Sequence, residues 1–108
     1  MTSREERQAL NEAAARDINE RLEDAHPTEP GQYIRMVCEC GRETCDRVIA
    51  ITPGEYEQIR TDPIQFAVVR DHVIGNIERV ILETDRFVVV AKREGVPAEV
   101  AVNEDPRA

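Results

Sequence analysis

The sequence predicts an α+β fold, in which a long N-terminal helix and a short second helix pack on a small, mainly antiparallel sheet. Three observations support this prediction: a capping box at the start of a charged, helix-like first quarter, a second capping box in mid-chain, and short β-branched runs separated by turns. The 108 residues have room for one core only. Because aromatic residues make up 4% and Trp is absent, aliphatic side chains must fill most of that core.

The first helix is predicted over residues 3–24. It begins with a capping box, in which Ser3 and Glu6 each bond the other residue's backbone N–H. A narrow apolar stripe with a spacing of four residues follows, formed by Leu10, Ala14, Ile18 and Leu22. We favour packing of this stripe on the sheet, with pairing to a second copy of the chain as the alternative. The helix is expected to end by His26, because Pro27 disfavours helical geometry in the residue that precedes it.

A short helix is predicted over residues 53–60, since Thr52 caps it, Pro53 suits its first position and Glu55 completes the second capping box. Strands are predicted at 33–37, 47–51, 66–69, 77–83 and 87–92. From residue 93 the composition turns to Glu, Pro, Ala and Asn with no periodicity of large residues. We therefore expect a single domain over 1–92 and a disordered acidic tail over 93–108.

Charge and composition exclude several classes of protein. The net charge is −8, and the sections 1–25, 26–61, 62–92 and 93–108 are each net acidic, which argues against a nucleic-acid-binding surface. No apolar run approaches the roughly 20 residues that span a bilayer, and the charged start does not resemble a signal peptide. Three cysteines within eight residues do not form a disulfide framework that closes long loops. A soluble protein of the reducing cytoplasm is therefore expected.

The cysteines form the motif C-x-C-G-x-x-x-C, with thiols at Cys38, Cys40 and Cys45. One segment supplies several ligands to one ion only by bending tightly around it, and Gly41 permits such a bend. The charged neighbours of the three cysteines argue against burial of all three in an apolar core. Thiolate-rich tetrahedral sites select zinc, so Zn²⁺ is the predicted cofactor and the turn is a predicted zinc knuckle. An iron–sulfur cluster and a thiol redox pair are the alternatives.

A fourth ligand is needed to complete a tetrahedron. His72 is favoured, because it follows the predicted strand at 66–69 and would be held rigidly against the turn. His26 is the alternative, in a more mobile position between the first helix and a proline-rich turn. The carboxylates Glu39, Glu43 and Asp46 are weaker candidates, since oxygen donors of this kind more often stay in solvent. The predicted metal site is therefore Cys38, Cys40, Cys45 and His72.

These residues resemble a family of small bacterial proteins of unassigned activity. Its members share C-E-C, a third Cys, I-x-L-T-x-x-E-Y, a Phe strand, P-G-H and a final hairpin; the corresponding stretches here are 37–45, 49–56 and 59–66. The resemblance covers roughly residues 15–92. It implies a zinc site in which the His of P-G-H corresponds to His72, although this chain has Arg-Asp-His there. The cysteine string is also similar to the zinc turn of post-SET segments in protein methyltransferases, which supports zinc geometry alone.

The predicted function is that of a small zinc-binding accessory, protein-interaction or regulatory domain with a structural Cys3His site. A zinc-thiolate redox or metal sensor is the second hypothesis, because clustered thiolates oxidise readily when exposed. A zinc enzyme is the third. Glu39 could act as its general base, but the deaminase pattern, the G-x-S-x-G elbow and the H-E-x-x-H helix are all missing. We expect a protein partner, and either a monomer or a homodimer formed through the N-terminal helix.

Overall fold

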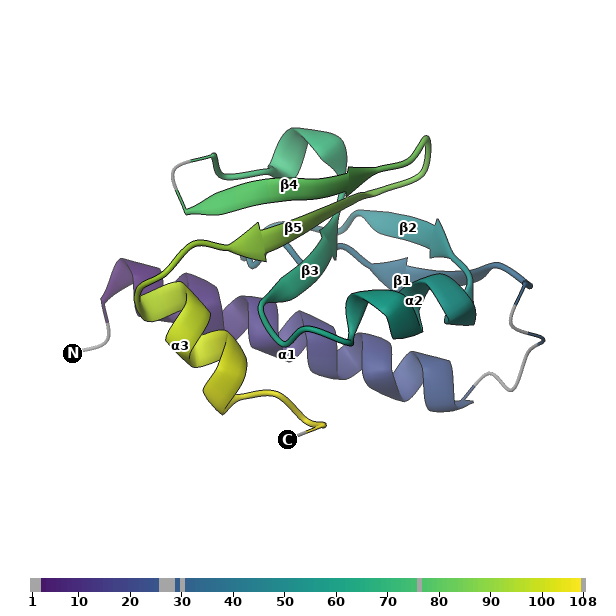
Figure 1. The fold of residues 1–108 in the computed structure, drawn as a ribbon, viewed down its shortest axis with the longest axis horizontal. Helices are drawn as coiled ribbons and strands as arrows, with labels where there is room; N and C mark the ends of the chain where they lie inside the picture. Colours follow the sequence, from purple (N-terminus) through teal and green to yellow (C-terminus); the bar gives the residue numbers. More distant parts are fainter. Residues whose placement is uncertain (1–2, 26–28, 30, 76, 108) are drawn as a thin grey trace.

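The fold is α+β, as predicted, in a computed structural model that describes residues 3–25, 29, 31–75 and 77–107. The elements in chain order are α1 (Arg4–Ala25), β1 (Ile34–Val37), β2 (Val48–Ile51), α2 (Pro53–Ile59), β3 (Gln65–Val68), the 3₁₀ turn η1 (Arg70–His72), β4 (Glu78–Glu83), β5 (Val88–Lys92) and α3 (Val96–Asn103). In Figure 1, α1 runs along one side of the molecule and the strands lie on its other side. Among the described residues, no helix combines the length and the apolar character that crossing a bilayer requires.

The strands form two small antiparallel sheets. β1 pairs with β2 so that Ile34 faces Ile51, and the second sheet has the order β3-β5-β4. A backbone hydrogen bond joins the sheets, because the Glu39 N–H just beyond β1 donates to the Ala67 carbonyl of β3 at 2.8 Å. This bond brings the segment that follows β1 beside β3, and so positions the cysteine-bearing turn against the second sheet.

The face that α1 buries differs from the predicted stripe. Leu10 and Ile18 are 43% and 48% exposed, so the expectation that their stripe packs on the sheet is wrong. The buried face is formed by Ala9, Glu12, Ala13, Arg16 and Asn19. The small alanines allow close approach, and the polar side chains bond backbone groups of other segments: the Asn19 amide bonds both the N–H and the carbonyl of Val37 at 2.8 Å. Hydrogen bonding to fixed backbone groups therefore decides this face, and periodicity of apolar residues does not reveal it.

The C-terminal region contains a helix, which corrects the expectation of a disordered tail over 93–108. α3 packs against α1, and Ala101 is 2% exposed. The buried Arg16 of α1 donates to the Ala101 carbonyl at 2.8 Å, and the Arg107 guanidinium donates to both carboxylate oxygens of Glu20 at 2.7 and 2.8 Å. These partners are more than 80 residues apart in the chain. The helix is stabilised by tertiary contacts, which local composition does not disclose.

A buried ionic cluster lies between α1 and the second sheet. Lys92 donates from its Nζ to a carboxylate oxygen of Glu12 and to one of Glu78, and all three side chains are at most 1% exposed. If all three were ionised, the cluster would bury one net negative charge, which is costly in a medium of low dielectric. Burial raises the pKa of Glu12 from 4.5 to about 8, against the opposing attraction of Lys92. One proton therefore stays on Glu12 at neutral pH.

This proton makes stability dependent on pH. The folded-state pKa of Glu12 lies above its ordinary value of 4.5, so its contribution is fully present below about pH 4.5 and is lost as the pH rises toward 8. We expect Glu12→Gln to remove this loss: the free energy of unfolding of the variant should gain on the wild type by on the order of 3 kcal/mol between pH 5 and pH 8. Urea unfolding across this pH range measures it. A variant that is destabilised equally at both pH values would show that Glu12 is ionised throughout.

Candidate metal centre

Four side chains converge at one end of the β1–β2 hairpin. The sulfur atoms of Cys38, Cys40 and Cys45 and a ring nitrogen of His72 all lie within 4.8 Å of one another. The Nδ1 atom of His72 is 3.7 Å from the Cys38 sulfur and 3.5 Å from the Cys45 sulfur. A zinc tetrahedron with bonds of about 2.3 Å to sulfur and 2.05 Å to nitrogen has sulfur-to-nitrogen edges of about 3.6 Å. The spacing of the four ligand atoms therefore fits one tetrahedral ion.

The three thiols are held by the connection between β1 and β2. The Cys38 N–H donates to the Arg47 carbonyl at 3.0 Å and extends the hairpin ladder, and the Cys45 N–H closes the turn on the Arg42 carbonyl at 3.1 Å. Gly41 has a φ of 76°, a conformation that favours glycine. A Cβ atom there would also lie 2.6 Å from the Gln8 carbonyl oxygen of α1. Glycine is therefore required both for the bend and for the close approach of the helix.

His72 is presented by η1, directly after β3. Its N–H donates to the Val69 carbonyl at 3.0 Å, which fixes the turn that carries the imidazole. The Val69 N–H in turn donates to the Cys38 sulfur at 3.3 Å. The Arg42 guanidinium reaches the Asp71 carbonyl at 3.5 Å and so links the cysteine turn to η1. Hydrogen bonds thus hold the cysteine turn and η1 against each other, in addition to the contacts among the four ligand atoms.

The thiols differ in their protonation. A hydrogen bond from the Cys38 thiol lowers the pKa of Cys40, and the same bond, together with burial, raises the pKa of Cys38. Burial raises the pKa of Cys45, although the Arg47 N–H opposes that rise. Cys38 and Cys40 are buried and Cys45 is half-buried. These contacts favour deprotonation of Cys40 over that of the other two thiols, and a bound cation would favour the deprotonated form of all three.

The weaker candidate ligands lie elsewhere. Glu39 does not belong to the four-residue metal group, and its side chain is fully buried in the core. Its Oε1 accepts from the Ala67 N–H at 2.9 Å, and its Oε2 accepts from the Tyr56 hydroxyl at 2.9 Å and the Asn19 amide at 2.8 Å. Glu43 and Asp46 are exposed and do not belong to the four-residue group, and His26 lies outside the described residues.

Sequence reasoning missed the structural role of Glu39 and Asn19. Burial raises the pKa of Glu39, while the bonds from Ala67, Asn19 and Tyr56 lower it. The carboxylate ties β1, β3 and both α1 and α2 together behind the cysteines. The C-E-C alternation was the available signal, because a residue between two thiols on an extended segment must face the opposite side.

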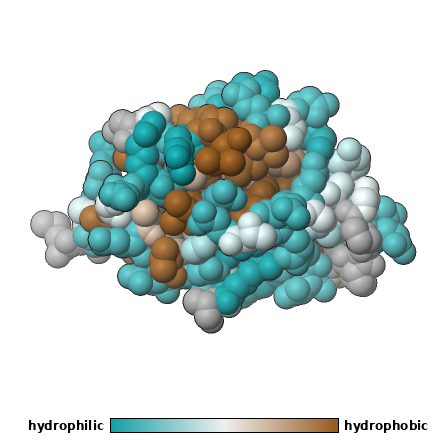
Figure 2. Space-filling model, in the orientation of Figure 1, coloured by the Kyte–Doolittle hydropathy of each residue, from teal (hydrophilic) through white to brown (hydrophobic). Residues whose placement is uncertain are grey.

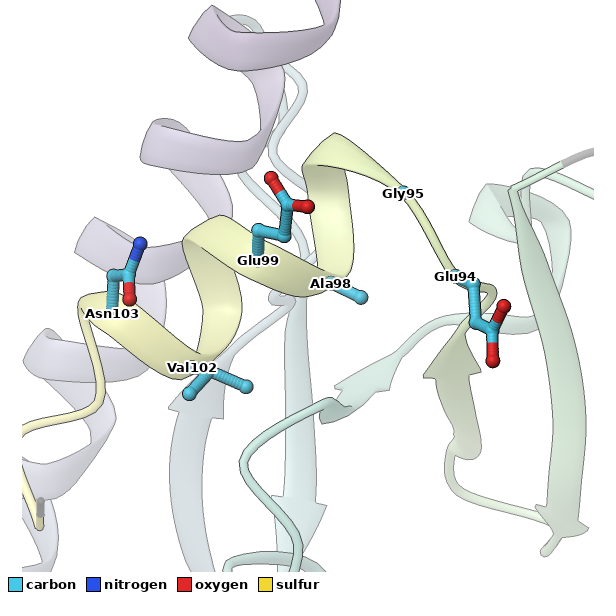
Figure 3. Close-up of a pocket in the computed structure, with 6 residues that line it drawn as sticks. All are labelled: Glu94, Gly95, Ala98, Glu99, Val102 and Asn103. Atoms are coloured by element: carbon cyan, nitrogen blue, oxygen red, sulfur yellow. The ribbon is translucent and has the colours of Figure 1, made fainter.

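A separate hollow lies along α3, as Figure 3 shows. Its lining includes Glu94, Glu99 and Val102, and the two carboxylates lie at different places along it rather than facing each other. None of its lining residues belongs to the cysteine cluster. The chemistry that the described residues offer to a metal is therefore concentrated at the hairpin end.

Comparison with known proteins gives no further guide to this site. No protein-family model matches the chain, and neither the curated proteins nor the solved structures contain a match. The resemblance to the bacterial family with the C-E-C and P-G-H pattern therefore stays a prediction.

Proposed function

We propose that this protein is a small zinc-binding domain in which one Zn²⁺ is held by Cys38, Cys40, Cys45 and His72. The observation that supports this best is the set of four ligand atoms from two chain segments, all within 4.8 Å of one another. Four protein ligands fill the coordination shell of zinc and leave no open position for substrate, which favours a structural rather than a catalytic role. The ion ties the β1–β2 hairpin to η1.

The charge of such a site is compatible with its surroundings. Three thiolates and one neutral imidazole around Zn²⁺ carry a formal charge of −1. The Val69 N–H at 3.3 Å from the Cys38 sulfur supplies one compensating dipole. The Arg42 guanidinium, held near His72 by its bond to Asp71, supplies a nearby positive charge. These contacts favour an anionic metal–thiolate centre over a neutral thiol cluster.

The role of the domain in this proposal is accessory: it binds a protein partner in the cytoplasm and does not catalyse a reaction. The surface that supports this is the exposed stripe of α1 formed by Leu10, Ala14 and Ile18. A hollow of about 370 Å³ lies between this stripe and the cysteine turn, with Ile18 and Cys45 among its lining residues. A partner seated there would contact both the helix and the metal-stabilised turn.

A zinc-thiolate sensor is the second candidate, and the half-buried Cys45 favours it. Hydrogen peroxide would oxidise two thiolates to a disulfide, peroxide being reduced to water and Zn²⁺ released. Zinc loss at low peroxide, reversed by a thiol reductant and added zinc, supports the sensor. Zinc that stays bound until the protein unfolds supports the structural role.

Elemental analysis tests the proposal, on protein purified under reducing conditions without a metal-affinity tag. We expect one zinc per chain in the wild type, and a loss of most of it in both His72→Ala and Cys45→Ala. The matched controls are His26→Ala and Glu43→Ala, which should retain the metal. Fully reduced wild type without metal, and unable to take up added zinc, would overturn the proposal. Retention by His72→Ala with loss in His26→Ala would move the fourth ligand to His26.

A further inference from the structure

A groove runs between α1 and the cysteine turn, which comprises residues 38–45. It consists of two adjoining hollows of about 610 Å³ and 370 Å³. Both hollows are lined by Asn11 of α1 and by residues 41–43 of the turn, so they meet where the two segments approach each other. The Asn11 amide donates to the Gly41 carbonyl at 3.3 Å and joins the two sides. The groove therefore lies beside the candidate metal centre, and Cys45 is part of its lining.

The two ends of the groove differ in chemistry. Along α1 the lining residues recur with spacings of three and four residues, so they share one face of the helix. They are Arg4, Arg7, Gln8, Asn11, Ala14, Ala15 and Ile18. Arg42 and Thr44 of the turn complete the arginine end, and Val37 completes the apolar end beside Ile18. A ligand that fills the whole groove therefore carries polar groups at one end and an apolar group at the other.

The arginine end differs in charge from the rest of the molecule. Hydrophilic side chains cover much of the face that Figure 2 shows, and over the whole chain acidic residues outnumber basic ones by 22 to 14. Arg4, Arg7 and Arg42 nevertheless take part in none of the ion pairs of the described residues. Against these three guanidinium groups, Glu43 is the one carboxylate among the residues that line this hollow. The arginine end therefore offers a site for carboxylates from outside the chain.

The chemistry of the two ends selects among possible occupants. Nucleic acid is a poor match, because its phosphates continue beyond three arginines and would meet the negative charge of the surrounding surface. A small inorganic anion would fill the arginine end and leave the apolar end uncovered. A second copy of the chain would bring its own net charge of −8 against the same charge. A short acidic segment of another protein, carrying an apolar side chain, satisfies both ends.

We infer that this groove binds an extended acidic segment of a partner protein, with carboxylates at the arginine end and an apolar side chain against Ile18. The inference rests on the accessory role proposed above and adds the chemistry of the partner. Arg7 and Ile18 are eleven residues apart, which is about 16 Å along the helix axis. An extended chain covers this distance in about five residues. The segment therefore has a cluster of acidic residues and an apolar residue about five positions away.

Selection from a phage-displayed library of random peptides tests this pattern, with reduced, zinc-supplemented wild type as the target. We expect the enriched peptides to share an acidic cluster and an apolar residue at the stated spacing. One selected peptide, synthesised with a fluorescent label, should bind more weakly as salt is added, because exposed ion pairs are screened. Enrichment of basic or uncharged peptides, or of no peptide, would overturn the inference.

Paired variants locate the peptide in the groove. Fluorescence anisotropy should show about tenfold weaker binding to Arg7→Glu, and unchanged binding to Arg79→Glu, which makes the same charge change at an exposed residue outside the groove. Acidic residues suit the N-terminal part of a helix, so Arg7→Glu should fold normally. Ile18→Ser should also weaken binding, whereas Leu10→Ser, at an α1 residue of similar exposure that does not line the groove, should not. Full binding by both Arg7→Glu and Ile18→Ser would overturn the inference.

Zinc content and sedimentation velocity of the same samples separate this inference from the proposed metal site. Zinc-loaded wild type that selects no acidic peptide would overturn the inference and leave the metal site standing. Wild type that takes up no zinc but binds the peptide in the groove would do the reverse. A wild-type dimer that dissociates in Arg7→Glu would show that a second copy of the chain fills the groove, and the inference would then be wrong.

Discussion

Removal of zinc is expected to lower the midpoint of thermal unfolding by about 20 °C. A ligand present at a thousandfold excess over its Kd stabilises the folded state by about 4 kcal/mol, and in a domain of this size 1 kcal/mol shifts the midpoint by roughly 4–8 °C. The position of the site explains why the effect reaches the whole domain. Cys38 and Cys40 belong to the buried core, and His72 comes from the turn that follows β3. Without the ion, the hairpin end and η1 are joined by weaker contacts, such as the bond from the Val69 N–H to the Cys38 sulfur and that from Arg42 to the Asp71 carbonyl.

Calorimetry with and without a chelator, under reducing conditions, measures this shift. Added Zn²⁺ should restore the original midpoint, and Mg²⁺ should not, because hard cations prefer oxygen ligands. Cys45→Ala should melt at the chelator-treated midpoint whether or not zinc is present. An unchanged midpoint after the metal has been removed and its loss verified would show that the core alone stabilises the fold. The proposal that zinc has a structural role would then be wrong.

Local signals account for the elements that the sequence predicted well. The helix predicted over 53–60 is observed as Pro53–Ile59, and its cap is the predicted one. The Thr52 side chain accepts from the Glu55 N–H at 3.1 Å, and the Glu55 carboxylate accepts from the Thr52 N–H at 2.9 Å. The strand predictions are likewise confirmed to within one or two residues of the observed bounds. Caps, prolines and β-branched runs act through neighbouring residues, so they can be recognised without the tertiary structure.

The candidate site was predictable because its thiols are close in the sequence and the chain offers few imidazoles. The surroundings of the site were not. Asn19 reaches Val37 and Glu39, and Arg16 reaches Ala101, through bonds between segments that only folding brings together. Polar residues on a helix normally indicate its solvent face, so the buried face of α1 was assigned to the wrong side. The segment that forms α3 was expected to be disordered because its composition shows no periodicity of large residues, and its packing against α1 arises only in the folded chain.

Glu39→Ala is expected to destabilise the protein by at least about 3 kcal/mol, although no atom of this side chain belongs to the four-atom metal group. The carboxylate accepts three buried hydrogen bonds, from the Ala67 N–H, the Tyr56 hydroxyl and the Asn19 amide. Truncation leaves these donors without an acceptor in a site from which water is excluded, and it also leaves a cavity. Urea unfolding of zinc-loaded protein measures the loss. Glu43→Ala, at an exposed position three residues beyond the second thiol, is the matched control and should change stability by less than about 0.5 kcal/mol.

Glu39→Gln separates the hydrogen bonds of this side chain from its volume. A glutamine keeps the shape and one acceptor, but in either orientation its amide nitrogen meets a donor: the Ala67 N–H in one, the Tyr56 hydroxyl and the Asn19 amide in the other. The Tyr56 hydroxyl can rotate to accept a bond, whereas the Asn19 amide is already fixed by both of its bonds to Val37. One donor pair therefore stays in conflict, and we expect a loss of about 1–3 kcal/mol, smaller than that of Glu39→Ala. A glutamine variant as stable as the wild type would show that volume alone matters at this position. The link between the two sheets would then rest on the Glu39 backbone bond to Ala67 and not on its side chain.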